Sequence, residues 1–393
     1  MAAERKPHVV VATRIYTPEA AAAAFRERAL VDALGAAGAR VTVLTTKVPG
    51  HAAMVGDDGG ASVSRWPVKR DNLGQVRGYF SYLSFDIPLA LRLLFTRRVA
   101  AVVVEPPPTT GAVSAVVCAL KRVPYVFYAA DVWSDASESV GGVPNFVVNT
   151  VRWLEVNVWR RAARVLAISP GVAARVRELS GDDANIALVG NGIDTETFQP
   201  AAVAADPPAG PYFVYAGTVS EWQGADVFVD AFRQLQETHP EARLLFFSEG
   251  SGRRQLEDRV RREGIAGVEF RGKVSPAEVA GYLSGAVAGL SSIVPGQGYD
   301  FALPTKIYAA LACDTPVIHY GTGAAQELIA DNDLGWACGA DVAAVAEAMR
   351  QAVSGQRRAD AGRLREWTLA NASLAGCAAK AADAVLACLP GRK

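Results

Sequence analysis

The residue types best suited to chemistry gather in residues 295–306, Pro-Gly-Gln-Gly-Tyr-Asp-Phe-Ala-Leu-Pro-Thr-Lys. This order predicts a glycine-rich loop followed by a helix that opens at Pro304-Thr305-Lys306. The unpaired N–H groups and the positive dipole of such a helix end suit a phosphate. Because Lys306 places a cation against that dipole, an anion is expected between them. An ordinary loop-to-helix junction with a solvated lysine is the alternative interpretation.

Three more glycine turns follow predicted strands in the same half of the chain. Each alone is typical of simple turn chemistry. Together with residues 295–306 they would lie at the carboxyl ends of strands of one sheet, where their amides converge on an anion and Arg253, Lys273 and Lys306 neutralise a diphosphate. The turns are Gly217-Thr218 to Gln223-Gly224, Ser248-Glu249-Gly250-Ser251-Gly252, and Arg271-Gly272-Lys273.

The elements that must position these residues alternate between short β-branched runs and helical segments. Apolar strands alternating with helices predict an α/β fold with parallel sheets covered on both faces. In the first half the expected strands are His8–Ala12, Arg40–Thr45, Ala101–Val104, Tyr125–Tyr128, Arg164–Ile168 and Asn185–Val189, with helices at Ala20–Ala37 and Val143–Arg161. In the second half they are Tyr212–Ala216, Arg243–Phe247, Val268–Phe270, Val287–Ser291 and Thr315–His319, with helices at about Ala225–Glu237, Arg253–Glu263, Pro276–Ser284 and Thr305–Ala312.

A proline-rich stretch, residues 198–211, interrupts the alternation and is expected to be an interdomain linker. We therefore predict two doubly wound domains, residues 1–200 and 201–368, and a final helix from about Leu369 to Leu389 within residues 369–393 that crosses back to the first domain. Ligands of such domains bind beyond the carboxyl ends of the strands, so the cleft between the two is the expected site.

Composition excludes several function classes. The 393 residues hold 40 basic and 40 acidic side chains, which gives no general attraction for nucleic acid. The five cysteines are scattered without a Cys-x-x-Cys pair, as expected of reduced thiols in a cytoplasmic protein. The N-terminus shows no apolar signal region, and no segment resembles a membrane span.

Residues 65–98 are locally basic, with a net charge of +5 and interleaved aromatic residues. This pattern predicts peripheral contact with anionic lipid or with a phosphorylated acceptor. A core helix with a solvated basic rim is the alternative.

The chain resembles the retaining glycosyltransferases of the family-4 type, which have the GT-B fold of two facing Rossmann-like domains. The resemblance covers residues 8–355 and is closest to the branch that acts on bacterial polysaccharides and amino-sugar acceptors. It rests on these segments in family order: Glu105-Pro106-Pro107-Pro108, Asp131-Val132-Trp133, Ile168-Ser169-Pro170-Gly171, Asn191-Gly192-Ile193-Asp194, Ala216-Gly217, Glu249-Gly250-Ser251-Gly252, Leu303-Pro304-Thr305-Lys306 and Thr315-Pro316-Val317.

The resemblance implies transfer of a sugar, with retention, from a nucleoside-diphosphate sugar to a small-molecule or lipid-linked acceptor. It implies no cofactor and no metal; the donor is the substrate, with UDP or GDP as the expected nucleotide. Asp131 would be catalytic, facing the sugar and the acceptor, and the acceptor side would include Arg14, Tyr16 and Trp133. The donor would be bound by Gly217, Thr218, Gln223, Glu249, Gly250, Arg253, Lys273, Leu303, Pro304, Thr305 and Lys306.

The chain also departs from the family. Phe301 and Ala309 stand where two glutamates for the donor sugar and ribose are usual, and Thr218 and Gln223 replace an arginine and a lysine. An alanine run, Ala20–Ala24, replaces a Gly-Gly loop. Either the donor is unusual, other residues compensate, or transfer has been lost. The alternatives to a transferase are therefore a nucleotide-sugar epimerase and a non-catalytic homologue that binds nucleotide sugar or a partner transferase.

Overall fold

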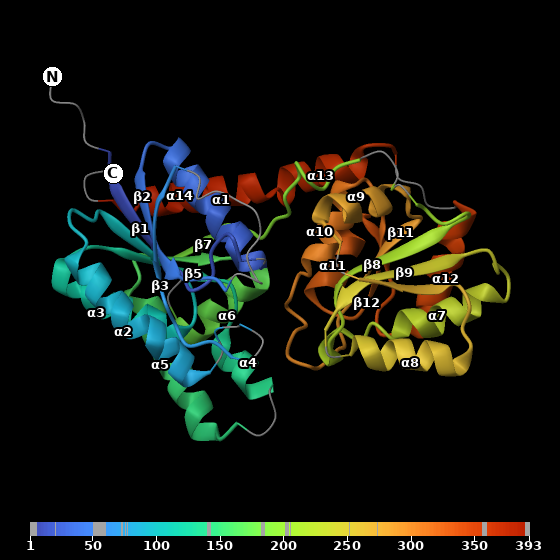
Figure 1. Cartoon of the computed structure of the whole chain (residues 1–393), viewed down its shortest axis with the longest axis horizontal. Helices are drawn as coiled ribbons and strands as arrows, with labels where there is room; N and C mark the ends of the chain where they lie inside the picture. Colours follow the sequence, from blue (N-terminus) through green and yellow to red (C-terminus); the bar gives the residue numbers. More distant parts are fainter. Residues whose placement is uncertain are drawn as a thin grey trace. The chain divides into compact units, whose positions relative to one another are not determined.

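The computed structural model describes residues 6–19, 21–49, 60–71, 74, 76, 78–139, 143–181, 185–200, 204, 206–250, 252–272, 274–355 and 360–389. The chain divides into two compact units. Unit 1 comprises Met1–Gly190 together with Leu374–Lys393, and unit 2 comprises Asn191–Ser373. Each unit is an α/β structure built on its own parallel sheet (Figure 1).

Within the described residues, the sheet of unit 1 has seven parallel strands in the order β3-β2-β1-β4-β5-β6-β7. The strands expected from apolar runs are present because helices cover both faces: every residue of β1 is buried. The edge strand β3 was not expected, since its residues alternate between exposed and half-buried and include two serines. The strands are β1 (His8–Ala12), β2 (Arg40–Thr46), β3 (Ser62–Trp66), β4 (Ala101–Val104), β5 (Tyr125–Ala129), β6 (Arg164–Ala167) and β7 (Ile186–Leu188).

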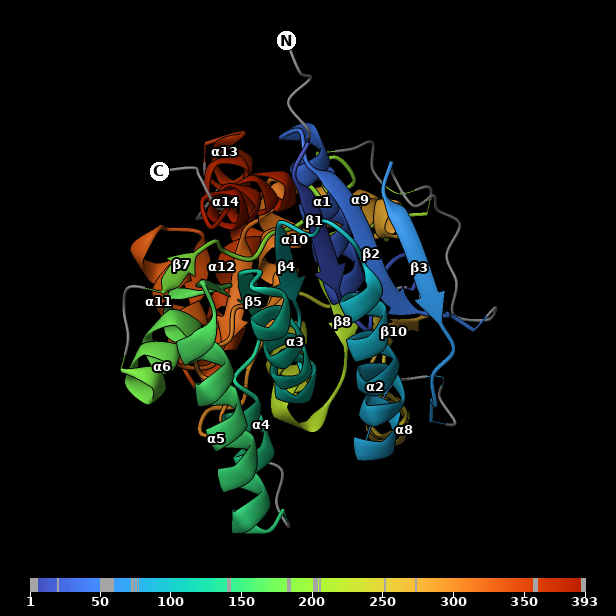
Figure 2. The same cartoon turned by 90° about the vertical axis from the view of Figure 1, so that its left-hand side faces the viewer.

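Helices cover this sheet in two layers. One layer contains α1 (Ala22–Ala36) and α14 (Leu374–Leu386), which contact each other and share a hydrophobic core with alternate residues of the strands. The other layer contains α2 (Tyr79–Phe95), α3 (Pro108–Lys121) and α5 (Asn145–Arg161), which lie side by side (Figure 2). The described residues of the unit also form α4 (Trp133–Ser139) and α6 (Pro170–Ser180).

The expected single helix Leu369–Leu389 is wrong, because the structure has α13 (Arg363–Asn371) and then α14, separated at Ala372 and Ser373. Ala372 leaves the helical conformation with φ −139°, and its carbonyl accepts a 2.9 Å hydrogen bond from the Ile193 N–H. Ile193 also forms a parallel β-bridge with Ser373. This pairing joins residues 191–200 to unit 2, so the division between units falls at residue 190 and not within the proline-rich stretch.

Unit 2 has a six-stranded parallel sheet in its described residues, ordered β10-β9-β8-β11-β12-β13. The strand order reverses between β8 and β11, which makes the carboxyl ends of these two strands the place where this fold binds ligands. The strands are β8 (Tyr212–Thr218), β9 (Arg243–Glu249), β10 (Val268–Arg271), β11 (Ala288–Ser292), β12 (Val317–Tyr320) and β13 (Gly335–Ala337). The helices are η2 (Glu221–Gln223), α7 (Val227–Gln236), α8 (Arg253–Glu263), α9 (Pro276–Gly285), α10 (Thr305–Ala312), α11 (Ala324–Asp331), α12 (Val342–Ser354) and α13.

Candidate functional site

Lys306, in the first turn of α10, lies over the end of β8. Its Nζ donates a 2.6 Å hydrogen bond to the Tyr215 hydroxyl, and a Cβ added to Gly217 would lie 3.3 Å from the lysine Cε. No side chain caps α10, and its first turn holds no acidic residue. Burial lowers the pKa of Lys306 to about 7. A cation, a glycine and an uncapped helix end therefore meet at the switch point of unit 2, which is the geometry of a phosphate site.

Buried polar groups gather at the same edge of the sheet. Ser291 and His319 are paired across β11 and β12 and are both fully buried. The hydroxyls of Ser248 and Ser291 have no hydrogen-bond partner in the described structure, and the His319 ring nitrogens have none of regular geometry. The pKa of His319 is lowered to about 4, mainly by burial and in smaller part by the nearby Lys306. Since each unsatisfied buried group costs about 1–3 kcal/mol, their concentration here indicates a polar ligand or ordered water.

The turns after β8 and β9 interlock through backbone hydrogen bonds. The Val219 N–H donates to the Glu249 carbonyl at 2.7 Å, and the Gly252 N–H donates to the Val219 carbonyl at 3.1 Å. Gly250 has φ +121°, and a Cβ there would lie 2.5 Å from the Val219 oxygen. Only glycine fits this position, because the left-handed backbone and the close approach both exclude a side chain.

Thr218 and Gln223, the residues that replace the family's cation pair, contact each other. Thr218 Oγ1 donates to Gln223 Oε1 at 3.1 Å, and Ser220 Oγ donates to the same oxygen at 3.0 Å. Gln223 is only 6% exposed. These bonds fix the amide within the turn, so the turn presents an oriented dipole at this position in place of a charge.

The loop before α10 is held by aromatic and carboxylate contacts. The rings of Trp222 and Tyr299 stack with centroids 4.5 Å apart. Asp300 accepts from the Gly296 N–H and from Thr322 Oγ1, the latter at 3.3 Å. The loop that precedes Lys306 is thus attached to the turn after β8 through Tyr299 and to the residues before α11 through Asp300.

The remaining predicted donor residues have other surroundings. Arg253 donates to the carbonyls of Ser248 at 2.8 Å and of Phe270 at 3.4 Å, so its guanidinium already binds the ends of β9 and β10. Leu303 packs against the core of unit 2. Lys273 lies outside the described residues.

In unit 1, Asp131 follows β5 and is exposed. The pKa of the carboxyl is raised, mainly because the surrounding protein desolvates it. The positive charge of Arg26 opposes this shift and the negative charge of Glu105 adds to it. This carboxylate stands at the carboxyl edge of the sheet, as the sequence predicts. Its role in catalysis stays a prediction.

A buried charged cluster lies next to Asp131. Arg26 forms an ion pair with Glu105, which also accepts a 2.7 Å hydrogen bond from Thr13 Oγ1. Glu27 is fully buried, and burial together with the neighbouring Glu105 raises its pKa well above the usual range. Glu27 therefore holds its proton more tightly than an ordinary glutamate does.

Arg14 and Trp133 come together through Tyr82. The Arg14 guanidinium lies 4.5 Å from the centroid of the Tyr82 ring and 5.8 Å from that of Trp133. It also donates to the carbonyls of Val76 and Pro106, so it is held in place by the backbone. Tyr16, the third predicted acceptor residue, is 1% exposed and packs in the hydrophobic core of unit 1.

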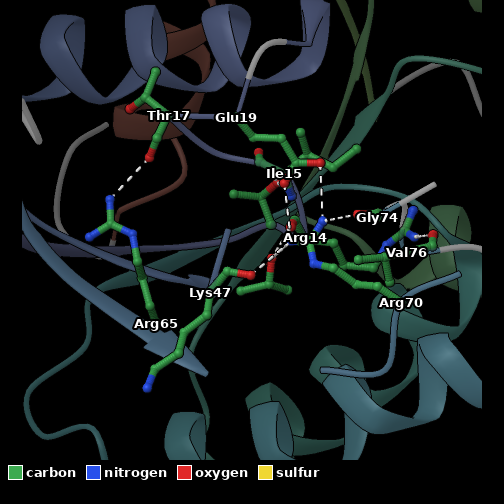
Figure 3. A network of polar contacts seen from close by, with 11 residues as sticks. Arg14, Ile15, Thr17, Glu19, Lys47, Arg65, Arg70, Gly74 and Val76 are labelled. Atoms are coloured by element: carbon green, nitrogen blue, oxygen red, sulfur yellow. Dashed lines mark hydrogen bonds and ion pairs between the residues drawn. The ribbon is translucent and has the colours of Figure 1, made fainter. Parts of the chain in front are cut away.

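The basic stretch 65–98 is partly used inside unit 1. Figure 3 shows Arg65 donating to the Thr17 carbonyl and Arg70 paired with Glu19. The described remainder of the stretch leaves Lys69, Arg97 and Arg98 exposed.

Sequence reasoning missed Tyr215, His319 and the Arg26–Glu27 pair. Tyr215 precedes Gly217 by two residues on β8, so strand alternation places both on one face, and this signal identifies it in retrospect. In the residues that the structure describes, no group of three His, Cys, Asp or Glu side chains has metal-binding geometry. No described helix is long and apolar enough to span a membrane.

Both halves of the chain match known families. Residues 23–192 match the model described as glycosyl transferase 4-like domain, and residues 210–354 match glycosyl transferases group 1. A curated relative, a GDP-mannose-dependent alpha-(1-6)-phosphatidylinositol dimannoside mannosyltransferase of Mycobacterium tuberculosis, is 32% identical over 181 residues. That match spans 44% of this chain and 45% of the relative, so it covers less than half of the relative's length.

Solved structures share the whole fold. Sucrose-phosphate synthase from Thermosynechococcus elongatus superposes with a TM-score of 0.75 at 18% identity, covering 96% of this chain and 98% of that one. Anabaena Alr3699/HepE in complex with UDP-glucose gives 0.70 at 14% identity, covering 97% and 100%. These likenesses establish the fold as the GT-B type.

Proposed function

Because the chain belongs to the glycosyltransferases of the GT-B type, we propose that it moves a sugar with retention from a nucleoside-diphosphate sugar to an acceptor. The bond between the anomeric carbon and the diphosphate oxygen breaks, and the nucleoside diphosphate leaves with the electron pair. The acceptor oxygen bonds to the same face of that carbon, and its proton passes to the departing phosphate.

The observation that carries the proposal is the position of Lys306 over Tyr215 and beside Gly217. Charge develops on the departing phosphate, so a lysine and helix amides aimed at it stabilise the transition state. These groups supply positive charge without a metal ion, and we propose metal-independent transfer, in which a chelator leaves turnover unchanged.

Similar proteins support a proposal for the donor nucleotide and the acceptor. The matched relative is named a GDP-mannose-dependent phosphatidylinositol dimannoside mannosyltransferase, and the HepE structure holds UDP-glucose. We therefore propose UDP or GDP as the donor nucleotide and a lipid-linked acceptor ahead of a small soluble one. Transfer in an interdomain cleft and a cytoplasmic location stay predictions from the sequence.

The test is a thermal-shift screen against UDP, GDP, dTDP, ADP and CDP without metal, followed by product analysis with the sugar nucleotide of the base that binds. One nucleotide should raise the melting temperature, because a ligand of the folded state stabilises it. Nucleotide binding without transfer to any acceptor would favour the non-catalytic homologue. If none of the nucleotides binds, the proposed donor site around Lys306 is wrong.

A further inference from the structure

The large apolar side chains that remain exposed are concentrated on one layer of unit 1. In the described part of the chain there are thirteen, and nine of them lie on α2, α3 and α5. Unit 2, of similar size, exposes only Leu369 among its described residues. The nine are Phe80, Ile87, Leu91, Leu94, Phe95, Val116, Leu120, Phe146 and Trp153.

These side chains are arranged in stripes. On α2, Ile87, Leu91 and Phe95 follow one another at four-residue intervals, so they lie along a single face. Val116 and Leu120 have the same spacing on α3. On α5, Phe146 and Trp153 are seven residues apart, which is about two helical turns. The helices are neighbours, as Figure 2 shows, and the nine side chains together form what we call the apolar face.

The ends of α2 and α3 are fixed to each other by Lys121. Its Nζ donates to the Leu94 carbonyl at 2.8 Å and to the Thr96 carbonyl at 2.7 Å. This contact joins the segment that carries Phe95, 75% exposed, to the segment that carries Leu120, 72% exposed. Large side chains held at such exposure on rigid helices indicate a surface that is covered in use.

Most of the exposed charge around the apolar face is positive. The only acidic residues of α2, α3 and α5 are Asp86 and Glu155, and both are buried. Asp86 accepts a 2.6 Å hydrogen bond from Thr110, and Glu155 accepts from the Trp133 N–H at 2.7 Å. Exposed cations border the face: Lys69, Arg97, Arg98 and Arg122.

A surface helix of unit 2 shows the contrast. On α8 the arginines alternate with Glu257, Asp258 and Glu263 and pair with them, as on ordinary solvated helices. The described residues of the three helices of the apolar face expose no acid, and their one ion pair of this kind joins Arg152 of α5 to Glu138 of α4 at 2.7 Å.

We propose that the apolar face docks on the surface of an anionic lipid bilayer. Its aromatic and aliphatic side chains would enter the boundary between headgroups and acyl chains, while the bordering cations meet lipid phosphates. A second copy of the chain fits less well, since two faces with the same positive border repel each other. The surface overlaps the basic stretch 65–98, which supplies α2, Lys69, Arg97 and Arg98. It extends beyond that stretch onto α3 and α5, while Arg65 and Arg70 of the stretch are used internally.

The experiment is sedimentation of the full chain with vesicles of phosphatidylcholine alone or mixed with phosphatidylglycerol. The protein should bind the anionic vesicles and be released by high salt, with binding to the neutral vesicles at least about tenfold weaker. The variant Leu91→Ser with Phe95→Ser and Leu120→Ser should lose binding by about tenfold or more, since these side chains supply inserted apolar area.

Two matched variants separate charge from apolar insertion. Arg97→Gln with Arg98→Gln and Arg122→Gln should remove the preference for phosphatidylglycerol. Leu369→Ser with Arg254→Gln and Arg262→Gln, on unit 2, should bind as the natural chain does. Absence of binding to anionic vesicles, or equal binding by the triple-serine variant, would overturn the proposal. An oligomer of the natural chain that the triple-serine variant no longer forms, as measured by sedimentation velocity, would also overturn the proposal, because the face would then be a protein interface.

Nucleotide binding plays no part in any of these measurements, so the result is independent of the proposed function.

Discussion

The Lys306 ammonium lies 3.8 Å from the centroid of the Tyr215 ring and 2.6 Å from its hydroxyl oxygen. Tyr215 comes from β8, and Lys306 comes from the helix that follows β11, so this contact joins the two sides of the switch point of unit 2. The ring face attracts the cation, yet burial opposes the charge and lowers the pKa of the lysine. A diphosphate would supply the missing counter-charge.

We predict that Lys306→Met weakens binding of the donor nucleotide by about 2 kcal/mol, or roughly thirtyfold, because a charge-assisted hydrogen bond is lost. In the unliganded protein the pKa of Lys306 is about 7. Because an anion favours the charged lysine, binding of the nucleotide above pH 7 should be coupled to uptake of a proton by Lys306. Nucleotide affinity should therefore fall as the pH rises from 7 to 9. Calorimetry in two buffers of different ionisation enthalpy measures the proton uptake.

The same lysine should shape the pH dependence of stability without ligand. Between about pH 7 and its ordinary pKa of 10.5, the unfolded chain binds one proton more at this site than the folded chain does. The free energy of unfolding contributed by this site thus rises with pH across that window. The difference between the natural chain and Lys306→Met in urea unfolding reports it, and parallel profiles would contradict the shifted pKa.

Gly250→Ala should damage the donor site. The new Cβ would meet the Val219 oxygen at 2.5 Å, with φ at +121°, so the interlocked turns after β8 and β9 must move. We expect lower nucleotide affinity and a lower melting temperature. Gly264→Ala is the matched control, since its φ is +64° and its Cβ would enter open space. That change should cost about 1 kcal/mol of stability and leave nucleotide binding intact.

The sequence predicts most of the fold because buried parallel strands are apolar runs. Strand β1 and the core of β8 appear where their β-branched and aromatic residues place them. Two features escape this signal. One is β3, where two of the three exposed residues are serines. The other is the break at Ala372, which depends on pairing with Ile193 about 180 residues earlier. Long-range backbone pairing of this kind leaves no local pattern.

The site was predictable to the extent that it is local. The spacing of the glycines and Lys306 predicts a phosphate-binding turn. Tyr215 and His319 have no such signal in the sequence, because only the folded sheet places them next to the lysine. The Glu27–Glu105 contact is hidden for the same reason, because one carboxyl lies on α1 and the other follows β4.

The Glu27–Glu105 pair should give a stability that falls as the pH rises. Glu27 keeps its proton in the folded state above its ordinary pKa of 4.5, while the unfolded chain loses it. The folded state then binds more protons, so the free energy of unfolding declines from about pH 4.5 upward. In Glu27→Gln this decline should be absent. Urea unfolding at pH 5, 6 and 7 provides the comparison.

Glu105→Gln should behave differently from Glu27→Gln. It removes the close partner of Arg26, whose side chain is 12% exposed, and leaves the nearly buried cation with Glu27, 4.0 Å away, as its remaining acidic neighbour. We expect a loss of about 3 kcal/mol of unfolding free energy at pH 7. Equal stabilities for the two variants would mean that Arg26 is not paired with Glu105 in solution.

Asp131→Asn should separate catalysis from donor binding. The carboxylate is exposed at the carboxyl edge of the unit 1 sheet, while the predicted nucleotide contacts all lie in unit 2. We therefore predict that kcat falls by about 10²- to 10⁴-fold, the range for loss of a group that transfers a proton or stabilises charge at the reacting centre, with the Kd for the nucleotide unchanged. Asp135→Asn serves as the control, because Asp135 is four residues away and pairs with Arg175 through bonds of 2.7 and 2.8 Å. That change should lower stability slightly and preserve kcat. Full activity in Asp131→Asn would mean that this carboxylate has no catalytic role, and would leave Arg14 and Trp133 as the predicted acceptor-side residues.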